Sequence, residues 1–328
     1  MRKTLFGLTT AAILSLSMAV QAAPIKLKFS HVVADNTPKG QMATKFKALV
    51  DERLKGKVVV EIYPNGQLFG DNKVLEALLL GDVQLAAPSL SKFKKYTKKL
   101  QIFDLPFLFN DMAAAERFQQ SEAGQGLLKS VEKKGLIGLG YMHNGMKQVS
   151  ASKPLHVPSD AKGLKFRIMS SDVLVKQFEA VGATPLKKPY SEVFTLLQTK
   201  AIDGQENTWS NIHSKKFYEV QDNITSSDHG LLDYMVVTSA EFWNGLDADV
   251  RTELKKALDE AVAVGNKVAA EKSKSDKQAI IDSKRTNVIE LSKEERQQWI
   301  DAMKPVWKEF EAIVGKDLLD AAISANKE

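Results

Sequence analysis

The first predicted elements of this chain follow from an alternation of apolar and polar positions that begins at residue 25. Residues 25–31 place apolar side chains at every second position, which is typical of a strand with one buried face. Thr37 and Pro38 then suit the N-cap and the first position of a helix, and apolar residues follow at helical spacing. A second strand over 58–63 is expected to end at a Pro-Asn-Gly turn.

Two blocks of the chain repeat this order of strands and helices. In the first block, a helix over 71–80 and a third strand over 83–87 complete a β-α-β-α-β order, which indicates a parallel sheet covered by helices. The second block predicts strands over 164–168, over 184–186 and from 205, with helices over 170–180 and 190–199. Two similar α/β lobes that face each other are the simplest explanation, and the alternative is a chance likeness.

The last third of the chain is predicted to be helical. No proline interrupts residues 247–285, and apolar residues keep helical spacing there, which makes an unusually long helix that we expect to span both lobes. Ser292 and Glu295 form a capping box before a further helix. The tryptophans and methionine of that region share one face, and this spacing indicates core rather than a ligand-binding surface.

The N-terminal segment has the pattern of a secretory signal peptide. Arg2 and Lys3 precede an uncharged apolar run over 5–20, and small residues near Ala22 suit cleavage by a signal peptidase. A membrane anchor is the alternative, but the run is shorter than the stretch of about 20 apolar residues that spans a bilayer. We therefore expect residues 1–22 to be removed and the mature protein to be exported and soluble.

Composition and charge narrow the class of protein. A chain of 328 residues favours two domains. The absence of cysteine excludes disulfides, a lipid-modified cysteine, thiol catalysis and thiolate metal sites. The formal net charge of +6 becomes +4 once Arg2 and Lys3 are removed, an excess that favours small anions weakly and is too small to indicate nucleic-acid binding.

The sequence contains no pattern typical of a catalytic, metal or cofactor site. The nucleophile elbow, the H-E-x-x-H motif and the phosphate-binding P-loop are all missing. The five histidines are scattered, and no two are four residues apart on one helix face, so we expect packed histidines rather than metal ligands. We therefore expect neither catalysis nor a cofactor, with an exported enzyme as the alternative.

Two basic residues are candidates for holding a small anion, because ligands of open α/β sheets lie beyond the carboxyl ends of the strands. Lys39 is in the first turn of a helix, where a cation is unfavourable unless something negative lies nearby. Arg167 lies between apolar residues near the end of a strand, where an unpaired guanidinium would be costly and a carboxylate would fit its planar fork. The alternatives are that Lys39 reaches water and that Arg167 forms an internal ion pair.

Further polar residues are weaker candidates. Asn207 enters a strand after a turn, and its amide can donate to the same carboxylate as Arg167. Lys147 is a possible second cation. A cluster of five lysines is interpreted as a solvated face of the protein, and a docking surface is the alternative. These lysines are Lys92, Lys94, Lys95, Lys98 and Lys99.

Several motifs of the mature chain occur together in one known family. They are Phe29-Ser30-His31-Val32-Val33, Thr37-Pro38-Lys39-Gly40, the stretch from Tyr63 to Asp71, Asn144-Gly145-Met146-Lys147-Gln148, Gly163-Leu164-Lys165-Phe166-Arg167 and Asp203-Gly204-Gln205-Glu206-Asn207. In these motifs the chain resembles the solute-binding proteins of tripartite ATP-independent periplasmic (TRAP) transporters, especially the branch that binds C4-dicarboxylates.

The resemblance implies a type II periplasmic-binding-protein fold, with two α/β lobes around a cleft and a long helix that spans both. We expect residues 23–145 and 233–272 to form lobe I, and residues 146–232 and 273–328 to form lobe II. The resemblance also implies that Arg167 pairs with a ligand carboxylate and that Tyr190 lies against the ligand. The full set of expected ligand-binding residues is Arg167, Asn207, Lys39, Lys147, Tyr190, Ser89, Asn144, Trp209, Tyr234 and His31.

The resemblance further implies a function in transport and not in catalysis. The expected ligand is a C4-dicarboxylate such as succinate, fumarate or malate, captured when the lobes close. The expected partners are the membrane subunits of a TRAP transporter in a Gram-negative bacterium, with the protein as a monomer in the periplasm. A sugar acid or keto acid as ligand and a membrane sensor as partner are the alternatives.

Overall fold

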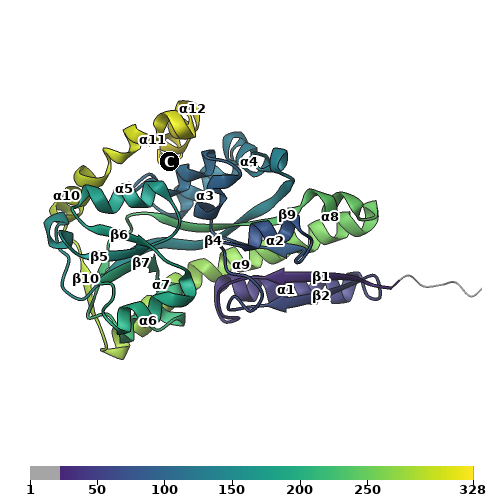
Figure 1. The fold of residues 1–328 in the computed structure, drawn as a ribbon, viewed down its shortest axis with the longest axis horizontal. Helices are drawn as coiled ribbons and strands as arrows, with labels where there is room; N and C mark the ends of the chain where they lie inside the picture. The colour runs from purple at the N-terminus through teal and green to yellow at the C-terminus, as the bar shows by residue number, and fades with distance from the viewer. Residues whose placement is uncertain (1–22, 328) are drawn as a thin grey trace, which may run out of the picture.

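The computed structural model of the protein describes residues 23–327 and contains two α/β lobes, which share one strand and one long helix (Figure 1). The expected signal peptide, residues 1–22, lies outside the described residues. Within residues 23–327, none of the helices has both the length and the apolar character needed to cross a bilayer.

The first lobe begins with the predicted strand and helix. Strand β1 (Ile25–Ser30) pairs in parallel with β2 (Val58–Tyr63) and β3 (Leu85–Ala86). Helix α1 (Pro38–Arg53) follows β1, and the hydroxyl of Thr37 accepts a hydrogen bond from the Gly40 amide, which confirms the predicted cap. The expected helix over 71–80 is shorter in the structure, where α2 covers Val74–Leu79.

The three predicted strands are parallel, as expected, but the sheet of this lobe is mixed, because it contains two further strands that the sequence pattern did not predict. Strand β9 (Leu231–Ser239) lies antiparallel between β3 and β4 (Leu136–Ala151). Every residue of β9 is buried, so the strand lacks the alternation that marks a half-exposed one. Strand β4 pairs with β9 as far as Met146 and with β7 from Lys147, so one 16-residue strand belongs to both sheets.

The second lobe confirms the second predicted block. Strand β5 (Lys165–Ile168) pairs in parallel with β6 (Thr184–Lys187) and β7 (Gly204–Thr208). Helix α5 (Asp172–Ala180) lies within the predicted range, and its N-cap is Ser171. The helices after β6 and β7 are α6 (Val193–Gln198) and α7 (Trp209–Ser214), and a parallel pair of strands, β8 (Asn223–Ser226) and β10 (Asn287–Glu290), extends the sheet beside β4.

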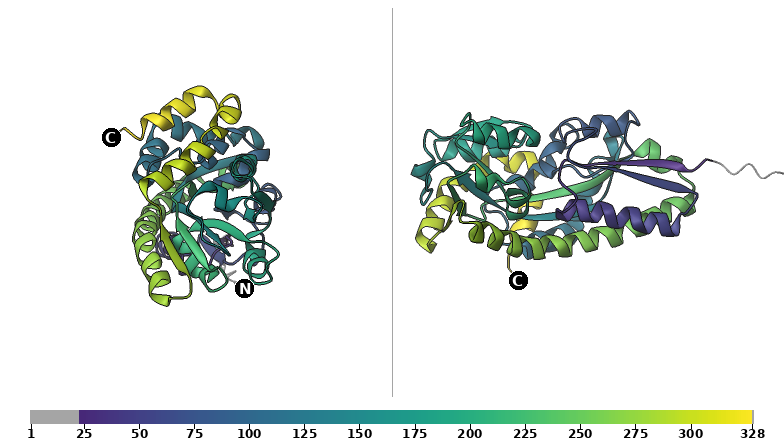
Figure 2. Two further views of the ribbon diagram at one scale, coloured as in Figure 1. Left: turned by 90° about the vertical axis from the view of Figure 1, so that its left-hand side faces the viewer. Right: turned by 90° about the horizontal axis from the view of Figure 1, so that it is seen from below.

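Helix α9 (Ala248–Ser283) confirms the predicted long helix with 36 residues. It packs against α1 in one lobe and α7 in the other, and it runs along much of the molecule (Figure 2). Helix α10 (Lys293–Met303) begins at the predicted capping box. The remaining elements are η1 (Leu90–Lys95), η2 (Lys99–Asp104), α3 (Met112–Gln120), α4 (Glu122–Lys129), η3 (Glu132–Lys134), η4 (Pro158–Ala161), η5 (Tyr190–Glu192), η6 (Phe217–Glu219), α8 (Ala240–Gly245), α11 (Val306–Val314) and α12 (Lys316–Ser324).

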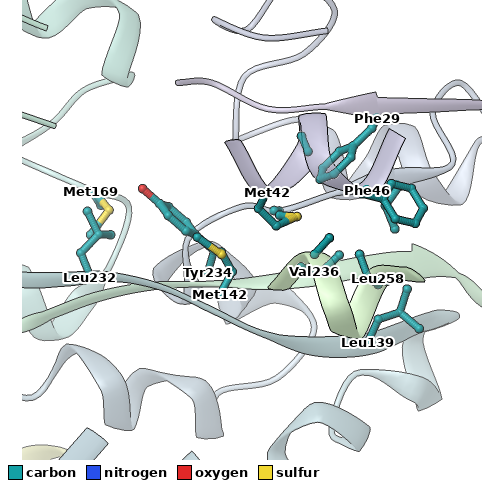
Figure 3. Close-up of a cluster of buried hydrophobic side chains, with 14 of the residues drawn as sticks. Phe29, Met42, Phe46, Leu139, Met142, Met169, Leu232, Tyr234, Val236 and Leu258 are labelled. Carbon is teal, nitrogen blue, oxygen red and sulfur yellow. The ribbon is translucent and has the colours of Figure 1, made fainter. Parts of the chain in front are cut away.

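A continuous hydrophobic core lies where α1, β1, β4, β9 and α9 meet. Figure 3 shows part of this core, with Phe29 and Phe46 on one side, Met169 and Leu232 on the other, and Tyr234 extending from β9 toward Met169. Trp299 and Met303 of α10 are also buried in it, which confirms that their stripe is core. This core continues into the second lobe, where Phe166 and Ile168 of the strand over Lys165–Ile168 belong to it.

Candidate functional site

A cavity of about 420 Å³ has walls from both lobes. This volume suits a small organic molecule. Apolar side chains, among them Val32, Met169 and Leu232, form part of its wall, and the remainder is polar. The predicted Pro-Asn-Gly turn contributes Asn65 and Gly66, both with positive φ, which lets the backbone itself turn along the wall.

Five of the expected ligand-binding residues line this cavity: Arg167, Asn207, Tyr190, Ser89 and Tyr234. Arg167 and Asn207 lie on the neighbouring parallel strands β5 and β7, so their side chains emerge close together near the strand ends. Tyr190 opens η5 directly after β6. Ser89 reaches the cavity from the first lobe, where it forms an isolated β-bridge with Tyr234 of β9.

Arg167 has the geometry of a group that is held ready for an anion. It is 2 % exposed, and its Nε donates to the carbonyl of Lys188 at 2.9 Å. Among residues 23–327 it forms no ion pair, so the alternative of an internal ion pair does not hold. Burial lowers the pKa of Arg167 to about 10, so the guanidinium is charged at neutral pH but poorly compensated. A carboxylate in the cavity would supply the missing charge.

Hydrogen bonds orient the amide of Asn207. Its Oδ1 accepts from Asn211 Nδ2 at 2.8 Å and from the Thr208 amide at 3.1 Å. Because both bonds use the oxygen, the nitrogen of Asn207 is left to donate. Asn211 also donates to the hydroxyl of Tyr234 at 3.5 Å, which connects the two lobes' contributions to the wall.

Lys39 is buried beside the cavity, but its ammonium group is not part of the cavity wall. Its Nζ donates to the carbonyl of Ala87 at 2.8 Å and lies 3.5 Å from the centroid of the Tyr234 ring. The alternative that the head of Lys39 reaches water is wrong, because the residue is 1 % exposed. Burial lowers its pKa to about 8, against a smaller opposing effect of Asp71.

Four other expected residues also lie outside the cavity lining. His31 is buried against Phe29, and Trp209 belongs to a core cluster of the second lobe. Asn144 donates to the Thr208 hydroxyl at 2.8 Å. Lys147 is fully buried and pairs with Glu206 at 2.8 Å, and the other oxygen of Glu206 accepts from His229. Their assignment as ligand-binding residues stays a prediction that this placement does not support.

Sequence reasoning missed several residues of the cavity wall. Lys92 was assigned to a solvated face, but it lines the cavity and donates to Asn72 at 2.8 Å. Asn211 of α7 and Lys215, which directly follows α7, also line the cavity, and the sequence analysis did not single out either residue. Asp71 is the carboxylate among the lining residues.

The charge of the cavity wall is positive. Lys92, Arg167 and Lys215 are at least half-buried cations, whereas Asp71 is the acid beside them. Burial lowers the pKa of Lys92 to about 8, Asp71 opposes that change, and Arg167 adds to it. Since neighbouring cations disfavour each other's charge, an anion that enters between them is stabilised by both.

Comparison with known proteins identifies the family. The profile of the bacterial extracellular solute-binding proteins, family 7, matches residues 29–313. The chain is 67 % identical to the C4-dicarboxylate-binding periplasmic protein DctP of Shewanella loihica over 97 % of its own length and 94 % of that protein. A TRAP periplasmic solute-binding protein of Shewanella oneidensis, solved with bound succinate, matches with a TM-score of 0.92 at 67 % identity, covering 93 % of this chain and all of that one.

A second solved structure extends the likeness. It is a TRAP periplasmic solute-binding protein of Pseudomonas aeruginosa with bound L-malate, with a TM-score of 0.85 at 49 % identity over 87 % of this chain and all of that one. The family consists of solute-binding proteins and not of enzymes. The chain belongs to family 7 of the bacterial extracellular solute-binding proteins.

Proposed function

We propose that this protein captures a C4-dicarboxylate such as succinate, fumarate or malate and delivers it to the membrane subunits of a TRAP transporter. One observation carries the proposal: the buried guanidinium of Arg167 faces a small cavity and forms no ion pair within the described chain. The ligands of the Shewanella oneidensis and Pseudomonas aeruginosa relatives support the choice of a four-carbon diacid.

The ligand is held at both ends. One carboxylate pairs with Arg167 and accepts from the free amide nitrogen of Asn207, while Met169 and Leu232 contact the carbon chain. The other carboxylate lies toward Lys92 and Tyr234 on the opposite wall. Two or three charge-assisted hydrogen bonds, at about 1.5–3 kcal/mol each, account for most of the roughly −8 kcal/mol of a micromolar complex.

Closure of the lobes follows from this arrangement. A ligand shifts an equilibrium between open and closed states only through contacts that differ between them. A dianion that touches both lobes makes its full set of contacts only when they are close. The proposal places the division between lobe I (23–145 and 233–272) and lobe II (146–232 and 273–328), where β4 exchanges its pairing partner from β9 to β7.

The proposal also covers the setting in which the protein works. We propose that residues 1–22 are cleaved near Ala22 during export to the periplasm and that the mature protein acts as a monomer. The membrane partner would bind the closed form, because that form carries ligand.

Titration calorimetry tests the proposed ligand. Wild-type protein is titrated with succinate, fumarate and L-malate, and with galactonate and pyruvate as a sugar acid and a keto acid. We expect micromolar or tighter binding for the diacids. Tight binding of galactonate or pyruvate alone would replace the C4-dicarboxylate by another organic acid as the ligand.

Substitution of Arg167 tests the proposed site. We expect Arg167→Ala to weaken succinate binding at least about 100-fold, because a buried bidentate ion pair is lost. The matched control is Arg53→Ala, which removes an arginine that pairs with Glu260 on the surface, away from the cavity. Equal succinate affinity in both variants would contradict the site.

A further inference from the structure

Lys39 poses a physical problem that the cavity contacts do not solve. It is a buried ammonium group with one hydrogen bond, to the carbonyl of Ala87 at 2.8 Å, and it has no ion pair among residues 23–327. A buried cation without a counter-charge is costly. Its main further contact is the face of the Tyr234 ring, whose centroid lies 3.5 Å from Nζ.

Tyr234 connects this buried cation to the cavity. The ring of Tyr234 is part of the cavity wall, whereas Lys39 is not. Figure 3 shows the hydroxyl of Tyr234 directed toward Met169, which also lines the cavity. Asn211 donates to that hydroxyl at 3.5 Å, so the phenolic oxygen accepts this bond and its proton can be donated to a ligand.

A cation against the face of a phenol ring withdraws electron density from it. Burial raises the pKa of Tyr234, and the nearby cation opposes that change, so the hydroxyl is a stronger hydrogen-bond donor to a carboxylate than it would be without Lys39. The positive charge of Lys39 thus acts on an anion in the cavity without touching it. In return, the anion supplies the compensation that the buried ammonium lacks.

We infer that Lys39 is a positioning residue that strengthens the Tyr234 hydroxyl as a hydrogen-bond donor to the second carboxylate of the ligand. The inference rests on the proposed function, since it assumes a dianionic ligand in this cavity. It assigns to Tyr234 and Lys39 the recognition of the carboxylate that does not pair with Arg167.

A double-mutant cycle separates this role from a merely structural one. Succinate affinity is measured by calorimetry for the wild type, Lys39→Met, Tyr234→Phe and the double variant. Methionine keeps a linear stem without the charge, and phenylalanine keeps the ring that Lys39 contacts. Lys39→Met weakens the hydrogen bond from the Tyr234 hydroxyl to the carboxylate, and Tyr234→Phe removes it. Because a hydrogen bond to a charged group is a strong one, we expect each single variant to weaken binding by about tenfold.

The coupling between the two substitutions decides the outcome. If Lys39 acts through the hydroxyl, Lys39→Met should cost about threefold or less once that hydroxyl is absent. Losses that multiply in the double variant would overturn the inference. Lys39→Arg keeps a cation near the ring and should restore most of the affinity that Lys39→Met loses, and failure of this rescue would also count against the role.

A second measurement covers the case in which the neutral Lys39 variants do not fold. The ionisable groups that face Lys39 are His31 directly after β1, Asp71 from the loop before α2 and Tyr234 from β9, while Lys92 and Arg167 lie farther along the cavity wall. In Lys92→Met, succinate binding at pH near 8 should still take up protons, as shown by heats in buffers of different ionisation enthalpy. Absence of this uptake would overturn the inference.

The titration of the wild type distinguishes a failure of the proposed function from a failure of the proposed role of Lys39. If the wild type does not bind succinate or another diacid, the proposed function fails. If it binds and Arg167→Ala does not, but the cycle shows no coupling, only the role of Lys39 fails.

Discussion

Lys94 and Asp172 form an ion pair that joins the two lobes, with 2.5 Å between Nζ and the carboxylate oxygen. Lys94 lies on η1 of the first lobe, and Asp172 is the first residue of α5 in the second. Lys187 pairs with the other oxygen of Asp172 at 3.1 Å. A contact of this kind exists only while the lobes are close, so it favours the closed state.

The first prediction concerns this ion pair. Asp172→Asn should weaken succinate binding by about two- to fivefold at low salt, a small effect because exposed ion pairs contribute little. The difference should vanish at high salt, which screens such charges. Calorimetry at two salt concentrations measures both effects. The control is Glu179→Gln, which breaks an exposed ion pair with Lys176 inside the same helix. Equal succinate affinities of Asp172→Asn and Glu179→Gln at low salt would refute the prediction.

The second prediction concerns selectivity for a second negative charge. Lys92→Met should weaken succinate binding by about 10- to 100-fold, because a charged hydrogen bond is lost. Butyrate has the same carbon chain with one carboxylate, so its weak binding should change little. Lys95→Met removes an exposed lysine of the same η1 segment and serves as the control. An equal loss of affinity for succinate and for butyrate would show that Lys92 does not bind the second carboxylate.

The third prediction is a fall in affinity as the pH rises through about 8. In the free protein, burial lowers the pKa of Lys92 to about 8, and burial does the same to Lys39. A bound carboxylate favours the charged form of each lysine and so raises both pKa values. The complex therefore holds more protons than the free protein above this pH, and binding takes up protons. Calorimetry from pH 7 to pH 10 measures the trend, and a constant affinity would contradict it.

The fourth prediction concerns the stability of the fold. Glu206 is buried between Lys147 and His229, and its replacement by glutamine removes the carboxylate that pairs with the Lys147 ammonium. Glu206→Gln should lower the free energy of unfolding by about 3–5 kcal/mol, as expected for one partner of a buried ion pair. Urea unfolding measures the loss. Asp259→Asn, which breaks an exposed pair with Lys255, should cost far less.

The same ion pair predicts an acid-dependent part of the stability. Burial alone would raise the pKa of Glu206, but Lys147 and His229 outweigh burial and lower it to about 2. A carboxyl with a depressed pKa stabilises the fold fully above its unfolded value, about 4.5, and loses that contribution as the pH falls toward 2. As the pH falls from about 4.5 to about 2, the difference in the free energy of unfolding between the wild type and Glu206→Gln should therefore disappear. An advantage that persists near pH 2 would refute this assignment.

Local signals predicted those elements that local interactions determine. The cap at Thr37, the capping box at Ser292 and the long helix α9 depend on neighbours along the chain, and all three are present. Strands β4 and β9 were missed because they lie in the middle of the fold. Their partners come from distant segments, and burial on both faces removes the alternation by which a strand is recognised.

The site was predictable where chemistry alone restricts the choice. An arginine between two apolar strand residues needs an anion, and Arg167 lies in the cavity wall. Lys39 needed compensation for the same reason, but no sequence pattern records that the face of Tyr234 provides the contact. Lys92 was hidden among exposed lysines, because the turn of η1 that directs one of them inward is set by the packing of Leu90 and Phe93.

The strand shared by the two sheets has a consequence for how the lobes open and how the protein melts. Because β4 and α9 are continuous through both lobes, neither lobe is a complete unit that could be excised and folded alone. Separation of the two lobes must then bend β4 and α9. This bending costs elastic energy, which favours the return of the lobes to their original arrangement. Heating should accordingly melt both halves together in one calorimetric peak, instead of two separate transitions.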